Sequence, residues 1–251
     1  QKYVLDLGCL TATALRNANR VLPAAVRDRL IKGTEFISTL MDENGNIPAI
    51  GDEDGGEAFR WSDQKSASMI TTMTAAAALF ERDDFKYHSN HCKEPAFWLQ
   101  GMDGLYTLQR LPARHQPSGI KVFPKGGYSV IHEPKFRQVL VFDHGPLGLP
   151  PLAAHGHADA LAVNLSVLGT PVLHDCGTYL YVGARQWRRY FRGTAAHNTV
   201  QVDGRDQAIQ GGPFQWHRHV RGKLIGANRV PTGYRLYGEH NGYHRRRVRH
   251  R

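Results

Sequence analysis

Hydrophobic and polar residues follow two different periods along this chain. In the first part, apolar residues recur every three or four positions, as at Val26, Leu30, Ile37 and Leu40, and this spacing predicts helices. Pro23 suits the first turn of a helix, and Ser62 suits an N-cap. We therefore expect helices over residues 4–22, 24–41, 62–80 and 94–100, with the first two paired as a hairpin.

After Pro112 the period becomes two. Residues 128–132, 139–143, 162–167 and 199–202 alternate or are rich in β-branched side chains, and turn residues such as Gly126-Gly127 separate them. This pattern predicts antiparallel strands, and residues 244–251 also have the pattern of a strand. Helices followed by strands predict an α+β fold, with a helical domain over residues 1–112 and a β-domain over residues 113–251.

The predicted helices are interrupted by a loop over residues 42–61 that is rich in glycine and acids. Its acids lack the regular spacing and the final bidentate Glu of an EF-hand, so a calcium loop of that type is excluded. We expect these acids to orient other side chains or to lie on the surface.

Composition places the chain among globular proteins. It has 251 residues, of which 41% are hydrophobic and 22% charged, and no apolar run approaches the roughly 20 residues that cross a bilayer. Three widely spaced cysteines exclude a dense disulfide framework and a Cys-x-x-Cys metal site. The first residues, Gln1-Lys2-Tyr3, contain neither an initiator Met nor a signal peptide, so we expect the chain to be a piece of a longer protein.

Charge is divided unevenly along the chain, whose formal net charge is +10. Residues 1–100 have 11 Lys and Arg against 14 acids, whereas residues 101–251 have 21 against 8. A positive surface concentrates polyanions: nucleic acid, anionic lipid or acidic polysaccharide. No groove-reading basic helix or ribonucleoprotein motif is present, which argues against nucleic acid. Arg185, Arg188, Arg189 and Arg192 form a dense cluster that either matches planar carboxylate or sulfate groups or is simply a solvated face.

Three short stretches suggest a metal site. They are His155-Gly156-His157-Ala158-Asp159, then His174-Asp175, then His197-Asn198. Imidazole and carboxylate are ligands that zinc accepts, and two histidines with one acid leave a fourth position open. By spacing alone, His174 could replace Asp175 as a ligand, and Asp159 could orient a ligating imidazole instead of binding the metal.

These stretches also resemble a known family. The runs His155-x-His157-x-Asp159, Gly169 through Thr178 and Tyr190 through Gly204 are similar to those of the heparinase II/III-like polysaccharide lyases, which include alginate and oligoalginate lyases. The specific resemblance covers about residues 120–210 and extends loosely to residues 46–52. It implies the C-terminal part of an (α/α) toroid followed by an antiparallel β-sandwich.

The resemblance further implies β-elimination at a uronic acid. Such an enzyme neutralises the C6 carboxylate, removes the C5 proton and protonates the departing C4 oxygen. By motif match, His155 is the active-site histidine, and His157, Asp175 and His197 bind one divalent metal, expected to be zinc. Arg192 and Asn198 are expected to contact substrate or to support the site. The metal is expected to organise the site, because elimination needs no attacking water.

The resemblance also bears on what surrounds the site. The family's catalytic tyrosine would immediately precede Gln1, so we do not assign it to Tyr3, and we expect this piece by itself to be a weak catalyst or inactive. The substrate would be an acidic polysaccharide such as a glycosaminoglycan or alginate, and the location would be the periplasm, the cell envelope or the exterior. The sequence leaves two alternative functions open: a cupin-like metal-dependent oxygenase, and a non-catalytic carbohydrate-binding sandwich whose strands are joined by zinc.

Overall fold

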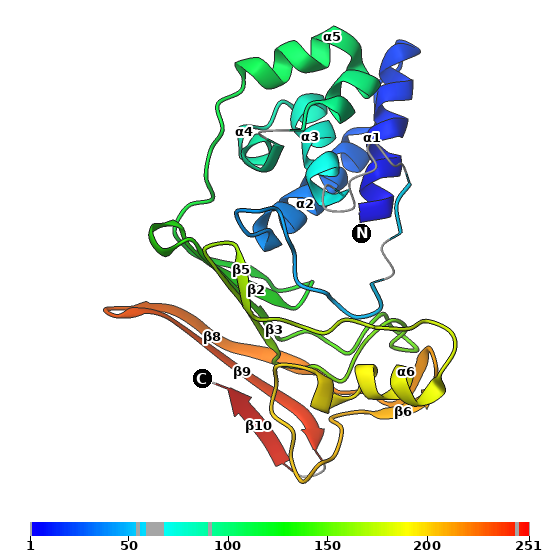
Figure 1. Cartoon of the computed structure of the whole chain (residues 1–251), viewed down its shortest axis with the longest axis vertical. Helices are drawn as coiled ribbons and strands as arrows, with labels where there is room; N and C mark the ends of the chain where they lie inside the picture. The colour runs from blue at the N-terminus through cyan, green and yellow to red at the C-terminus, as the bar shows by residue number, and fades with distance from the viewer. Residues whose placement is uncertain (1, 54–55, 59–67, 90–91, 244–245, 251) are drawn as a thin grey trace. The chain divides into compact units, whose positions relative to one another are not determined.

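The computed structural model describes residues 2–53, 56–58, 68–89, 92–243 and 246–250. The chain divides into two compact units, one formed by Gln1–Ile47 and Gly55–Gln116 and the other by Pro48–Asp54 and Pro117–Arg251. Figure 1 shows helices in the first unit and sheets with one further α-helix in the second. The segment Pro48–Asp54 therefore lies with the second unit, although it precedes residue 112 in the chain.

The first unit contains five α-helices and a short 3-10 helix among its described residues. They are α1 (Lys2–Asn17), α2 (Ala24–Leu40), α3 (Ser68–Phe80), α4 (Asp83–Lys86), η2 (Tyr87–Ser89) and α5 (Glu94–Arg110). Ile37, Met73 and Phe85 are buried in its core, as the helical spacing of apolar residues requires. The chain leaves helical geometry soon after α1, because Asn19 is left-handed at φ 52°, and the helix therefore ends earlier than predicted. The predicted N-cap Ser62 lies outside the described residues.

The last helix is longer than its pattern predicts. The sequence indicates a helix over residues 94–100, and α5 breaks at the next residue, Gly101, which has φ 63° and ψ −148°. Glycine adopts this conformation without a steric penalty. The helix resumes beyond the break and reaches Arg110.

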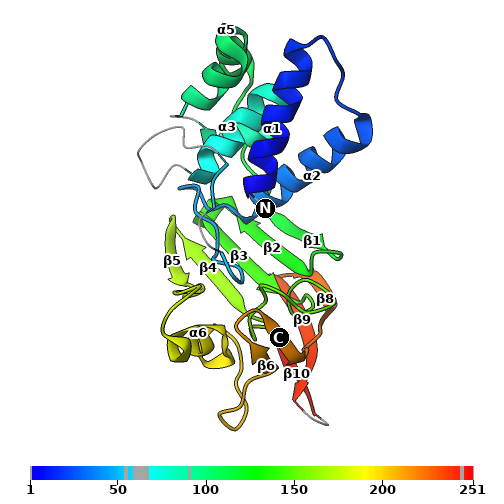
Figure 2. The ribbon, with the colours of Figure 1, turned by 90° about the vertical axis from the view of Figure 1, so that its right-hand side faces the viewer.

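A five-stranded antiparallel sheet forms the first part of the second unit. Its strands are β1 (Gly119–Phe123), β2 (Tyr128–Glu133), β3 (Gln138–Asp143), β4 (Val163–Val167) and β5 (Thr170–Leu173), and Figure 2 shows them side by side in chain order. Val130 and Val141 are partners across β2 and β3, and both are buried. The strands predicted at 128–132, 139–143 and 162–167 are confirmed, as is the α+β fold class.

A second sheet packs against the first. It consists of β8 (Gly222–Val230), β9 (Gly233–Tyr243) and β10 (Arg246–His250), with β9 in the centre, while β6 (Ile209–Gly212) and β7 (Gln215–Arg218) form a separate hairpin. A Cβ atom at Gly238 of β9 would lie 2.5 Å from Leu161 Cδ2 and 2.7 Å from Phe142 Cζ of β3. Glycine at this position lets the two sheets approach closely.

Two segments of the second unit differ from the sequence pattern. The strand predicted at 199–202 is wrong, because this segment is irregular and has only an isolated bridge at Val202. Conversely, the arginine cluster forms a helix, α6 (Arg185–Arg192), which the apolar pattern did not indicate. No helix within the described part of the chain has both the length and the apolar character needed to cross a membrane.

Candidate functional site

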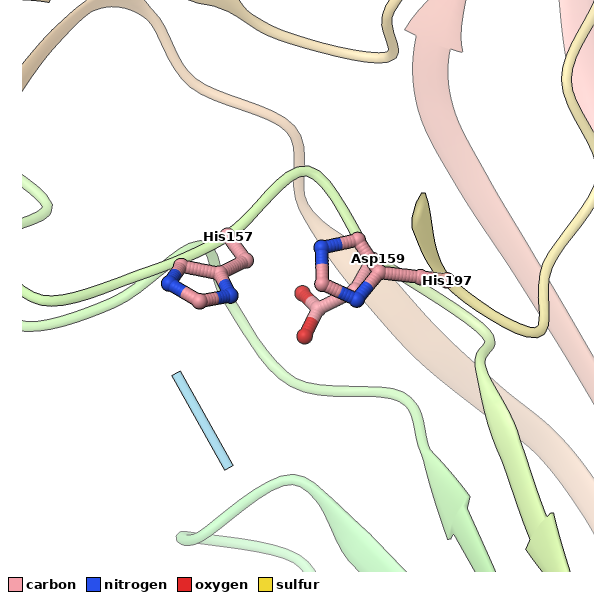
Figure 3. A group of neighbouring side chains, drawn as sticks. All are labelled: His157, Asp159 and His197. Atoms are coloured by element: carbon pink, nitrogen blue, oxygen red, sulfur yellow. The ribbon is translucent and has the colours of Figure 1, made fainter. Parts of the chain in front are cut away.

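The residues of the three histidine-containing stretches meet in the second unit. His155, His157 and Asp159 lie in the connection from β3 to β4, Asp175 follows β5, and His197 follows the 3-10 helix η4 (Thr194–Ala196). His157, Asp175 and His197 are buried. Figure 3 shows the side chains of His157, Asp159 and His197 gathered in one place, although His197 lies 40 positions after His157 in the sequence.

One nitrogen of His157 is hydrogen-bonded, and the other has no hydrogen-bond partner among the described residues. Its Nε2 donates to Asp52 Oδ1 over 2.9 Å, and an ionised carboxylate can only accept. A neutral imidazole that donates through Nε2 keeps its lone pair on Nδ1. Nδ1 of His157 is buried without a hydrogen-bond partner in the described structure. A buried, unsatisfied lone pair is costly unless a ligand occupies it.

His197 has the same arrangement with the nitrogens exchanged. Its Nδ1 donates to Asp175 Oδ2 over 2.7 Å, and its Nε2 is buried without a partner in the described part of the chain. The second oxygen of Asp175 accepts from the backbone N–H of Gly177 over 2.8 Å. Each imidazole is thus oriented by a carboxylate, an arrangement common around metal-binding histidines. The ring centroids of His157 and His197 are 5.2 Å apart.

Asp159 completes one group of possible ligand atoms. The donor atoms of His157, Asp159 and His197 all lie within 4.8 Å of one another, and so do those of Asp175, Cys176 and His197. The predicted trio of His157, Asp175 and His197 combines members of both groups. The assignment of Asp175 as the carboxylate ligand stays a prediction, and the geometry offers Asp159 as the alternative.

Electrostatics favour a cation at this position. Burial raises the pKa of Asp159 despite the neighbouring histidines, and burial together with the charge of Asp159 raises the pKa of Asp143 well above its usual range. Burial alone would lower the pKa of His197, but its hydrogen bond to Asp175 and the nearby carboxylates raise it. A dication would compensate these buried acids, and it would compete with a proton for Nε2 of His197. The residues present therefore fit a divalent metal.

Asp52 fixes this arrangement from a distant part of the sequence. Its side chain is fully buried, and besides His157 it accepts hydrogen bonds from Thr178 Oγ1 over 2.8 Å and from both terminal nitrogens of Arg188. Burial alone would raise the pKa of Asp52, but these hydrogen bonds and the charge of Arg188 hold it well below its usual range. The backbone N–H of Asp52 donates to the carbonyl of His155 over 3.0 Å.

His155 differs from the other two histidines because its side chain is 57% exposed. Its Nδ1 lies 3.1 Å from the hydroxyl of Tyr181, which in turn donates to the carbonyl of Asp52 over 3.1 Å. The backbone of His155 is left-handed at φ 60°, a conformation that is uncommon outside glycine and concentrates at functional sites. His155 is therefore oriented by its neighbours while its ring remains accessible.

The two predicted substrate contacts lie in different environments. Asn198 is partly buried, and its Nδ2 is buried without a recorded partner in the described structure. Arg192 is 0% exposed, donates from Nη1 to the carbonyl of Gly212 over 2.7 Å and stacks on Trp216. Burial and the charge of Arg188 lower the pKa of Arg192 to about 10. Arg192 anchors the β6–β7 hairpin, and substrate contact by either residue stays a prediction.

Sequence reasoning did not assign Asp52, Thr178, Tyr181 or Arg188 to the site. Thr178 and Arg188 belonged to runs already noted, namely Gly169 through Thr178 and the arginine cluster. Asp52 stood at the end of the loosely similar segment 46–52. Its contact with His157 joins positions 105 residues apart, which no local pattern reveals.

Comparison with known proteins identifies the family. The profile described as "Heparinase II/III-like, C-terminal" matches residues 115–251, more than half of the chain. The chain belongs to the heparinase II/III-like family. This membership gives no support to the alternative of a cupin-like oxygenase.

Solved structures agree with the heparinase II/III-like fold. A heparinase III structure has a TM-score of 0.65 at 19% identity over 91% of this chain. The heparan sulfate lyase HepC from Pedobacter heparinus has a TM-score of 0.66 at 16% identity over 94%. The chain spans 32% of the length of each of these proteins. A search of curated protein sequences found no match.

Proposed function

We propose that the protein containing this chain is a polysaccharide lyase that cleaves an acidic, uronate-containing polysaccharide by β-elimination. Membership of the heparinase II/III-like family supports this class of reaction. The observation that carries the proposal is the presence of an accessible histidine, His155, beside two buried imidazoles, His157 and His197, which belong to one group of possible metal ligands and each have one nitrogen without a partner in the described structure. From the family resemblance we also propose a periplasmic, cell-envelope or secreted location.

We further propose that His157 and His197 bind one divalent ion, zinc by its preference for nitrogen and carboxylate ligands, with Asp175 or Asp159 as the third ligand. The bound ion would supply positive charge that holds the buried acids and the two imidazoles in place. The chain's own residues do the rest of the positioning: Asp52 orients His157, and Asp175 orients His197. This rigid base keeps the segment that contains His155 in a fixed position.

In this proposal His155 is the residue of this chain that contacts the substrate at the reacting sugar. The hydroxyl of Tyr181 and the carboxylate of Asp52 lie next to Nδ1 of His155, at 3.1 and 3.4 Å. Because Nδ1 is held in this way, Nε2 is the nitrogen that faces the substrate. It can accept or donate a proton at C5 of the uronate, or bind the uronate carboxylate. The acidic substrate also complements the positive charge of residues 101–251.

An eliminase assay tests the proposal. The full-length protein is incubated with alginate, heparan sulfate, chondroitin or hyaluronan, and the ultraviolet absorbance of the unsaturated uronate product is followed. We expect activity on at least one polymer and a loss of roughly 100-fold or more in His155→Ala, as is typical of a proton-transfer residue. His174→Ala, which changes an exposed histidine close to Asp175, is the matched control and should retain activity. Absence of product on all four polymers would contradict the proposal.

The burial of both metal-site imidazoles also favours a second candidate, a non-catalytic sandwich that zinc holds together. His157 and His197 are 1% and 8% exposed, as in structural zinc sites. This candidate predicts zinc binding and polysaccharide binding without any unsaturated product. The same assay, combined with a metal analysis, distinguishes the two.

A further inference from the structure

A basic groove lies in the second unit, beside α6. Two adjoining cavities of about 490 and 380 Å³ share Arg189 and Gln210 in their linings. The larger is also lined by Arg205 and Arg218, and the smaller by Arg185. We call the surface formed by these four arginines and Gln210 the arginine groove. None of His155, His157, Asp175 and His197 lines either cavity.

Arginines outnumber acids in the lining of the groove. Within the described part of the chain, no ion pair or side-chain hydrogen bond is recorded for Arg189, Arg205 or Arg218, whereas the neighbouring Arg188 is fully engaged by Asp52. Asp203 and Asp206 also line the larger cavity, and Asp206 Oδ1 accepts from the backbone N–H of Thr194 over 2.9 Å. The four arginines of the groove therefore leave an excess of positive charge over these two acids. Concave surfaces with an excess of one charge concentrate ions of the opposite charge.

The walls of the groove are held in place by hydrogen bonds. Gln210 Nε2 donates to the carbonyl of Arg189 over 2.9 Å, which ties β6 to α6. The hydroxyl of Tyr243 accepts from the backbone N–H of Val202 over 3.1 Å and lies 3.1 Å from the carbonyl of Arg205. A site built on a fixed scaffold loses less entropy when it binds a ligand.

The lining favours an acidic saccharide over a nucleic acid. Guanidinium groups pair with carboxylate and sulfate through two parallel hydrogen bonds, and Gln210 and Asp203 provide partners for sugar hydroxyls. Among the described residues that line the two cavities, Tyr243 is the one aromatic, and it is buried, so the linings offer no exposed ring for stacking bases.

We propose that the arginine groove is a second binding site, which holds carboxylate or sulfate groups of an acidic polysaccharide away from the metal-site histidines. The choice of an acidic polysaccharide rests on the proposed function, whereas the affinity for anions rests on the groove alone. A polymer bound here would be retained by the protein independently of the chemistry at His155.

A binding measurement on the full-length protein tests this inference. Isothermal titration with heparan sulfate and alginate oligosaccharides is compared for the wild type, for the double variant Arg189→Ala/Arg205→Ala and for Lys223→Ala/Arg229→Ala. The last is a control with the same change in charge, because Lys223 and Arg229 are exposed on β8 and line neither cavity. The groove variant loses charge-assisted hydrogen bonds to the ligand, so we expect its binding to weaken by roughly 10-fold or more. The control should change it by less than about twofold.

The readout does not depend on lyase activity, so failure of the proposed function and failure of this inference are distinguishable. Weaker binding in the groove variant alone supports the inference, even for a protein that yields no unsaturated product. Equal binding in all three proteins, or equal weakening in both variants, would overturn it. Tighter binding of a single-stranded DNA oligonucleotide than of either saccharide, lost in the groove variant, would also overturn the assignment to a polysaccharide. Two controls accompany the measurement. Circular dichroism melting curves show whether each variant is folded. The variant Arg189→Lys/Arg205→Lys, which keeps the charge, should weaken binding less than the alanine variant.

Discussion

Arg188 of α6 donates two hydrogen bonds to the carboxylate of Asp52, which lies 136 positions earlier in the chain. The side chain of Arg188 is 5% exposed and that of Asp52 is 0% exposed. Asp52 also orients His157, so this ion pair joins α6 to the candidate metal site. The guanidinium of Arg188 further packs over the rings of Tyr181 and Phe214, each at 5.2 Å.

Replacement of Arg188 by methionine should strongly destabilise the second unit. The substitution leaves a buried carboxylate without its cation, and removal of one member of a buried ion pair costs about 3–5 kcal/mol. Chemical denaturation of the wild type and of Arg188→Met measures the difference in the free energy of unfolding. Arg185→Met, an exposed position on the same helix, should change it by less than about 0.5 kcal/mol. Similar losses in the two variants would contradict the role given to the ion pair.

The depressed pKa of Asp52 predicts a specific loss of stability in acid. A carboxylate with a lower pKa in the folded state stabilises the fold above its unfolded pKa of about 4, and this contribution disappears as pH falls further. The free energy of unfolding should therefore decrease as pH is lowered from about 5 to 3. Asp52→Asn should be less stable at neutral pH and should show a shallower decrease over that range. Parallel pH profiles for the two proteins would show that Asp52 contributes nothing to the acid sensitivity.

Gly51 should not tolerate a side chain. It has φ 57°, and a Cβ atom there would lie 2.3 Å from the carbonyl oxygen of His155. Gly51→Ala must therefore move the segment that carries Asp52 away from His155, at a cost of about 1–3 kcal/mol. Gly226→Ala in β8 is the control, since its nearest contact would be 3.5 Å. Equal melting temperatures for the wild type and Gly51→Ala would contradict this close approach.

The sequence predicted those parts of the fold that depend on local patterns. Residues 128–132 mix apolar and polar side chains, and residues 139–143 are a short apolar run rich in β-branched side chains. Short runs of either kind between turn residues are typical of strands. The segment 199–202 has similar residues but no partner strand. Its backbone groups are bonded by side chains instead, since Gln207 Nε2 lies 3.4 Å from the carbonyl of Val200 and Tyr243 accepts from Val202.

Helix α6 and its contribution to the site could not be predicted from local patterns, because its buried side chains are charged. The inward face of α6 carries Arg188 and Arg192, which are buried, while Trp187 and Tyr190 are 48% and 50% exposed. A helix that turns arginines toward the core lacks the apolar face by which helices are recognised in a sequence. The buried arginines are stable because distant groups, Asp52 and the carbonyl of Gly212, accept their hydrogen bonds. The sequence indicated the candidate histidines and a role for the acids of the 42–61 loop in orienting other side chains or on the surface, but not that Asp52 among them orients His157.

We infer that the free nitrogens of His157 and His197 bind one divalent ion together. The decisive measurement is metal analysis of the purified full-length protein by mass spectrometry, with its melting temperature measured with and without a chelator. We predict about one zinc ion per chain in the wild type and in the control His174→Ala, and a melting temperature that a chelator lowers. His157→Ala and His197→Ala should each lose the metal and the response to the chelator. A wild type that holds no divalent metal after incubation with zinc, or variants that retain it in full, would contradict the claim.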